Sequence, residues 1–225
     1  MPYTEHDISV GGELSRTQGS RFNYNASGEV WLIGEHVGDM NIDGKTDLNI
    51  RLGKRDTLVA NLHAGFMHRK PTFFFRHFHS QSTWWDNYDL SREVRFKVDG
   101  TLRLKKLGTK LQVGFENVSN YTYFGMQNTL LKGKDAKSVI PTDFSHAVGV
   151  MQADNVQVFG ASLSQELKWK IVHWDNRISY QTSSNQDALP LPTVDVYTNL
   201  YLLFRIAKVM RVQLGADMRF FTSYY

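Results

Sequence analysis

Cysteine is absent from the 225 residues of the chain, so disulfide bonds and thiolate metal sites are excluded. No run of about 18 consecutive apolar residues occurs either, which excludes helical membrane proteins. The chain also lacks a concentrated block of one charge, because the residues behind its net charge of +4 are spread along its whole length. Nucleic-acid binders usually gather basic residues on one face or in one run, so no nucleic-acid partner is expected.

Polar and apolar residues alternate with a period of two over stretches of about ten residues, longer than an ordinary soluble strand. The clearest stretches are Met40–Leu52, Val94–Leu104 and Val194–Ile206. A helix would spread their charges all round its surface, so the alternation predicts strands. One side of these strands is apolar and carries Ile42, Leu48, Ile50, Phe96, Val98, Leu102, Leu200, Leu202 and Phe204. The other side is polar and carries Asp43, Lys45, Asp47, Arg51, Arg95, Lys97, Asp99, Arg103, Asp195 and Arg205.

Eight less regular stretches bring the total to about eleven predicted strands. They are Ile8–Leu14, Phe22–Leu32, Leu58–His68, Phe73–His79, Leu111–Tyr123, Gln157–Trp169, Trp174–Gln181 and Met210–Phe220. Towards the C-terminal half, short connections alternate with long loops at about 81–92, 126–155 and 182–193. Alternate connections of an up-and-down barrel emerge at one rim, so the long loops are expected to lie together there.

The fold class that follows is all-β, with residues 1–225 forming one antiparallel up-and-down barrel domain. Alternation alone leaves two orientations open. A soluble β-sandwich or barrel hides its apolar side in a core, whereas a transmembrane barrel turns that side to lipid and wets its lumen. About ten residues at roughly 3.3 Å each, tilted near 45°, cover roughly 23 Å of the roughly 25 Å apolar band. This length favours the transmembrane barrel.

Three segments carry a resemblance to a known family. They are LPLPTVDVYTNLYLLFRIAKVMRVQLGADMRFFTSYY at 189–225, HWDNRISYQTSSNQDA before it, and the earlier FRHFHSQSTWWDNYDLSREVRF. These segments resemble the putative porin family of Bacteroidota outer membranes, over about the last two thirds of the chain. The resemblance implies a barrel in a bacterial outer membrane, with outer-membrane lipid and small hydrophilic solutes as its partners. It implies no catalytic residue.

The chain is expected to be a piece of a longer barrel. Members of the family it resembles are longer, and its first residues, MPYTEHDISV, do not form a secretory signal. An odd count of about eleven strands points the same way, because single-chain bacterial barrels close with an even number. The predicted barrel is therefore incomplete.

No constellation of residues indicates an enzyme, a cofactor or a metal. A nucleophile elbow, a phosphate loop and a zinc-protease motif are all absent from the sequence. His77 and His79 share one side of a predicted strand, but a metal needs three or four converging ligands. Asp43 and Asp47 share their side with Lys45, which favours a neutralising charge ladder over a catalytic carboxylate pair.

The predicted function is a passive outer-membrane channel for small hydrophilic solutes. Its polar side would line the pore and its apolar side would face lipid, because water can solvate charges of both signs in a lumen. A slight cationic excess on the polar side predicts a mild preference for anions. Two alternatives stay open: the barrel portion of a plugged active outer-membrane transporter, and a soluble β-sandwich or barrel that binds a ligand. The sequence indicates no oligomeric state.

Overall fold

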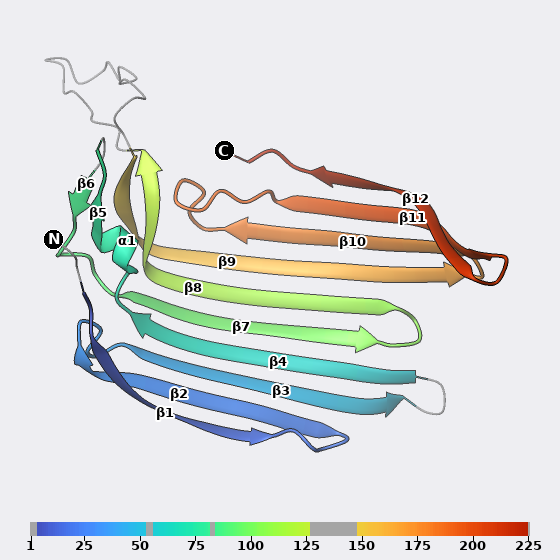
Figure 1. The fold of residues 1–225 in the computed structure, drawn as a ribbon, viewed down its shortest axis with the longest axis horizontal. Helices are drawn as coiled ribbons and strands as arrows, with labels where there is room; N and C mark the ends of the chain where they lie inside the picture. The colour runs from blue at the N-terminus through green and yellow to red at the C-terminus, as the bar shows by residue number, and fades with distance from the viewer. Residues whose placement is uncertain (1–3, 53–55, 82–83, 127–147, 225) are drawn as a thin grey trace, which may run out of the picture.

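The computed structural model describes residues 4–52, 56–81, 84–126 and 148–224. Ten antiparallel strands form one curved sheet in the order of the chain (Figure 1). They are β1 (Asp7–Arg16), β2 (Phe22–Gly34), β3 (Met40–Leu52), β4 (Asp56–Arg69), β7 (Glu93–Leu104), β8 (Thr109–Met126), β9 (Val148–Trp169), β10 (Val172–Ser183), β11 (Val194–Ile206) and β12 (Met210–Phe221). The predicted all-β, up-and-down architecture is confirmed.

One predicted strand is wrong. The stretch Phe73–His79 lies outside the large sheet and forms the short helix α1 (Phe73–Arg76) followed by β5 (His77–His79). β5 pairs only with β6 (Trp84–Asp86), in a separate two-stranded sheet. Pro71 precedes the helix and Thr72 caps its start, with the Thr72 carbonyl accepting the Phe75 N–H at 3.0 Å. Proline and the cap end the extended run before the aromatic residues begin.

The sheet is open over the residues that the structure describes, because β1 and β12 are its two edges and each pairs on one side only. This agrees with the predicted incomplete barrel. The main sheet holds ten strands rather than about eleven, however, so the odd count no longer supports that prediction.

The connections divide between the two ends of the strands (Figure 1). One end carries the short turns of the β1–β2, β7–β8, β9–β10 and β11–β12 hairpins, beside the end of β3 and the start of β4, and we call it the short-turn rim. The other end carries the β2–β3 turn and the long connections between β4 and β7 and between β10 and β11, beside the end of β8 and the start of β9. We call it the long-loop rim. Such an asymmetry is typical of outer-membrane barrels.

Strands β8 and β9 are longer than the sequence indicated, with 18 and 22 residues. Residues 148–155 therefore belong to β9, although the predicted loop 126–155 included them; residues 127–147 of that loop lie outside the described residues. Asn120 interrupts the alternation in β8 with a positive φ of 56°. A residue with positive φ interrupts the strand locally, and Asn120 accordingly has no partner in the β8–β9 register.

Very little of the described protein is buried. The buried hydrophobic residues are Val118, Ala153, Val156 and Ala188, all towards the long-loop rim. A soluble sandwich of this size would instead enclose two apolar inner faces. No helix in the described ranges is long and apolar enough to cross a membrane.

Candidate functional site

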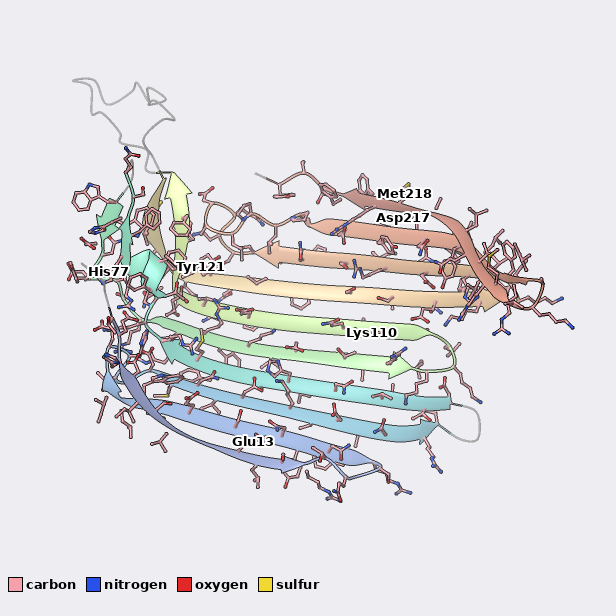
Figure 2. The ribbon with its side chains drawn as sticks, in the orientation of Figure 1. Glu13, His77, Lys110, Tyr121, Asp217 and Met218 are labelled. Atoms are coloured by element: carbon pink, nitrogen blue, oxygen red, sulfur yellow. The ribbon has the colours of Figure 1, made fainter. Side chains whose placement is uncertain are left out.

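The strand register sorts the predicted site residues onto two faces of the sheet. Asp43 lies opposite Gly65 of β4, which lies opposite Lys97 of β7; Lys45 lies opposite His63, which lies opposite Asp99. Continued through every ladder, the alternation puts all ten predicted pore-lining residues on one face and all nine predicted lipid-facing residues on the other. We call these the polar face and the apolar face. Figure 2 labels neighbours from each on β12, Asp217 on the polar face and Met218 on the apolar face.

The apolar face is exposed in this sheet. Ile42 on β3 is 53% exposed, Phe96 on β7 46% and Leu200 on β11 52%. Contiguous apolar surface of this kind is rarely left in contact with water, so it marks a surface that lipid or another apolar partner covers.

The polar face carries an ion-pair ladder with His63 at its centre. Its Nε2 lies 2.5 Å from Asp43 Oδ2, and its Nδ1 lies 2.8 Å from Asp99 Oδ1. This geometry suits an imidazolium, whose two ring N–H groups would donate to the two ionised carboxylates. Lys45 Nζ lies 3.0 Å from Asp43, and Lys97 Nζ lies 3.5 Å from Asp99. Two carboxylates, two lysines and His63 thus meet across strands β3, β4 and β7.

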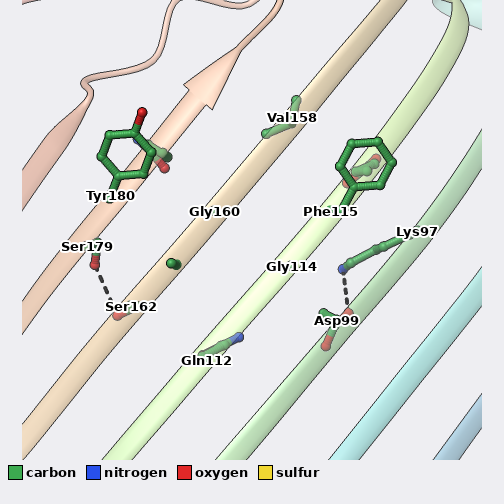
Figure 3. Close-up of a pocket in the computed structure, with 13 residues that line it drawn as sticks. Lys97, Asp99, Gln112, Gly114, Phe115, Val158, Gly160, Ser162, Ser179 and Tyr180 are labelled. Atoms are coloured by element: carbon green, nitrogen blue, oxygen red, sulfur yellow. Dashed lines mark hydrogen bonds and ion pairs between the residues drawn. The ribbon is translucent and has the colours of Figure 1, made fainter.

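A hollow of about 360 Å³ lies beside this ladder, between β7 and β10 (Figure 3). Gly114 of β8 and Gly160 of β9 face each other in the register, so no side chain fills the polar face at that point. Gln112 contributes to the lining, and a hydrogen bond from Ser179 Oγ to Ser162 Oγ at 3.1 Å lies along it. Its lining is mixed, because Lys97, Asp99 and Glu116 share it with the rings of Phe115 and Tyr180.

Other predicted residues of the polar face differ in how they are paired. Arg95 pairs with Glu116 at 3.2 Å. Asp195, which is largely buried, accepts a hydrogen bond from Arg219 Nε at 2.7 Å. Asp47 accepts a hydrogen bond from Asn61. Exposed members without an ion pair in the described part of the chain are Arg51, Arg103 and Arg205.

A polar network at the long-loop rim fastens the connection between β4 and β7. We call this connection the rim strap, residues 70–81 and 84–92. Asp39, immediately before β3, is 1% exposed and forms an ion pair with Arg92. It also accepts the Lys70 N–H at 3.0 Å. Glu35 binds Lys70 Nζ at 2.8 Å and Arg76 Nη1 at 3.2 Å. The strap is therefore held to the β2–β3 turn at both of its ends.

Aromatic rings hold the strap to β8. Phe75 packs on Phe124 with ring centroids 4.6 Å apart, and Trp85 lies 5.7 Å from the same ring. Phe78 stacks on Trp85 at 4.8 Å. Figure 2 labels His77 of this strap beside the end of the sheet. The strap thus covers part of the long-loop rim.

A comparison with known protein families identifies the family to which the chain belongs. The family described as Putative porin matches residues 1–225, the whole chain. The chain belongs to this porin family. No curated protein sequence matches it significantly.

The porin contains functional candidates that sequence reasoning did not find. His63 is the centre of the carboxylate ladder, which the sequence does not reveal because its partners depend on the register. The Asp39–Arg92 pair joins residues 53 positions apart. Facing glycines, Gly114 and Gly160, carry no chemical signal of their own. Among the described residues, no group of three or more histidines and carboxylates is arranged to hold a metal ion.

The rim strap of this porin is expected to respond to acid through Asp86. The His77 ring first, and then the His79 ring, hydrogen-bond its carboxylate at 3.0 and 2.9 Å and hold the pKa of Asp86 below its ordinary value of 3.8. A lowered folded-state pKa gives a stabilisation that is complete above the unfolded value and is lost as the pH falls through the folded value. We therefore expect the β5–β6 hairpin to loosen below pH 3.8, measured by fluorescence of Trp84 and Trp85.

Asp86→Asn is the matched control for this titration. It removes the ionisable group while keeping one hydrogen-bond acceptor, so the acid transition of the two tryptophans should disappear. An unchanged transition in this variant would assign the loosening to another group.

Proposed function

We propose that the polar face lines an aqueous route across a bacterial outer membrane and that the apolar face contacts its lipid. The observation that carries the proposal is the consistent sorting of charged and apolar residues onto opposite faces of ten strands, with the apolar face exposed. Membership of the porin family supports the outer membrane as the location.

The dimensions of the strands fit this role. β3 and β11 have 13 residues each, and β10 has 12. At about 3.3 Å per residue and a tilt near 45°, each is long enough to span the roughly 25 Å apolar band of the membrane. By the usual layout of such barrels, the long-loop rim would face outside and the short-turn rim the periplasm.

The transported class is small hydrophilic solutes, which would pass by diffusion. Charges of both signs occur together on the polar face, as in the His63 ladder, and half-exposed groups of this kind are stable when water solvates them. A hydrated solute can exchange its water for these groups and leave again, because no single contact is strong. The route needs no cofactor and no enzymatic step.

Cysteine labelling at two adjacent positions tests the orientation of the faces. The chain has no native cysteine, so Asp47→Cys and Leu48→Cys each create a single thiol at the same depth of β3. A thiol in water ionises and reacts, whereas a thiol against hydrocarbon stays protonated. In lipid vesicles, we expect a charged, water-soluble thiol reagent to label Asp47→Cys at least about tenfold faster than Leu48→Cys.

Equal or reversed labelling rates would contradict the proposed orientation. A second measurement separates this proposal from the soluble alternative. A soluble β-sandwich would remain a monodisperse monomer without detergent, whereas the proposed barrel needs detergent or lipid to cover its apolar face. Stepwise conductance in planar bilayers then tests transport directly.

A further inference from the structure

Charge pairing on the polar face changes along the strands. Asp43, Asp99, Glu116 and Asp195 all form ion pairs there. At the short-turn ends of the β7–β8 and β11–β12 hairpins, cations instead lie directly opposite other cations. These two hairpin ends therefore carry opposed positive charges that no facing carboxylate pairs.

The clearest like-charged pair belongs to the β7–β8 hairpin. Arg103 of β7 lies directly opposite Lys110 of β8, and both side chains are exposed. Their neighbours across the adjoining strands are Val59 on β4 and Ser164 on β9. Within the described residues, neither cation has an ion-pair partner. Figure 2 labels Lys110 near the short-turn end of β8. Like charges at directly opposed positions destabilise a sheet, so an anion between them would relieve this repulsion.

The nearby carboxylates are already engaged elsewhere. Asp56 accepts the backbone N–H groups of Thr57 at 2.7 Å and of Lys106 at 3.1 Å. Glu166, two residues along β9 from the position opposite Lys110, pairs with Lys168 at 3.0 Å. Neither of them neutralises the Arg103–Lys110 pair.

We propose that Arg103 and Lys110 bind small oxyanions at the short-turn mouth of the polar face. The guanidinium can hold two oxygens of a phosphate-like group in its planar fork, while the ammonium supplies a second positive charge. Arg205 and Arg211 repeat the arrangement, because they lie directly opposite each other on β11 and β12. This inference rests on the proposed channel and assigns it a substrate class: anions that carry a phosphate-like group are concentrated at this mouth.

The test is inhibition of chloride current by inorganic phosphate in planar bilayers of phosphatidylcholine. The intact protein is compared with the double variant Arg103→Gln and Lys110→Gln. A matched control, Lys45→Gln with Lys97→Gln, removes the same charge from the same face at positions that have carboxylate partners at 3.0 and 3.5 Å. Conductance steps in potassium chloride show that each variant has folded and inserted.

Phosphate is expected to lower the chloride conductance of the intact protein, and the Arg103–Lys110 double variant should need about tenfold more phosphate for the same inhibition. The control pair should retain the inhibition. Equal inhibition in the double variant and the intact protein, or none in either, would overturn the anion site while leaving the channel in place. No conductance at all would contradict the proposed function itself.

A last comparison separates free phosphate from lipid headgroups. Phosphatidylglycerol is added to the bilayer in the absence of inorganic phosphate. Inhibition that appears here, and only here, would show that the cations bind headgroups and would overturn the assignment to solutes. An unchanged conductance supports a site that faces the aqueous route.

Discussion

Leu200→Arg is expected to destabilise the membrane-inserted protein by about 2–4 kcal/mol, the cost of a cation on the lipid face of a barrel at the bilayer midplane. Leu200 is the middle residue of β11 and is 52% exposed on the apolar face. Its cross-strand neighbours, Trp174 and Ala216, offer no carboxylate to the new charge. Equilibrium folding into phospholipid vesicles, titrated with urea, measures the loss.

The matched control is Asn199→Arg, one residue away at the same depth. Asn199 lies on the polar face, opposite Asp175 and Asp217. A cation there meets water and two acidic residues, so its effect should stay below about 1 kcal/mol. Similar losses of folding free energy in the two variants would mean that lipid does not distinguish the two faces, which would contradict the proposed orientation.

Arg92→Met is the second substitution with a large expected effect, because it leaves the carboxylate of Asp39 buried without its ionic partner. Asp39 is 1% exposed and would keep only the N–H of Lys70. Removing one partner of a buried ion pair typically costs about 3–5 kcal/mol. We expect the rim strap to open, and limited proteolysis of residues 84–92 to become faster.

A double variant distinguishes a broken pair from a general defect in the strap. Adding Asp39→Asn removes the buried charge, so the double variant should be more stable than Arg92→Met alone. Lys70→Met is the surface comparison: it loses a half-exposed pair with Glu35, which is worth about 0–1 kcal/mol. If the double variant were no more stable than the single one, the ion pair would not be what holds the strap.

Strand positions could be predicted where charge and apolar residues alternate strictly. The predicted bounds Met40–Leu52 and Val194–Ile206 are those of β3 and β11. The strand prediction was wrong where a proline and ring packing, rather than alternation, determine the conformation. Residues Phe73–His79 look like a strand, but Pro71 ends the extended chain and the ring of Phe75 is drawn onto Phe124. Such packing between distant segments leaves no trace in local periodicity.

The faces of the candidate site could also be predicted, whereas its pairings could not. A period of two determines which residues of one strand share a side, and this assigned the ten polar and nine apolar residues. Which residue of the next strand lies opposite depends on the register, which short windows of sequence do not contain. The position of His63 between Asp43 and Asp99 is set by two such registers at once.

The nearest-neighbour order of the sheet has a consequence for how the chain assembles. Every strand of the large sheet pairs only with the strands before and after it in that sheet, and within the described residues four short turns close hairpins at the same rim. Loop-closure entropy is small for such contacts, so each hairpin can nucleate locally before it joins its neighbours. The long connections join completed hairpins rather than forming them. Changes in the length of these connections should therefore alter the surface of the long-loop rim and have little effect on the order in which the hairpins fold.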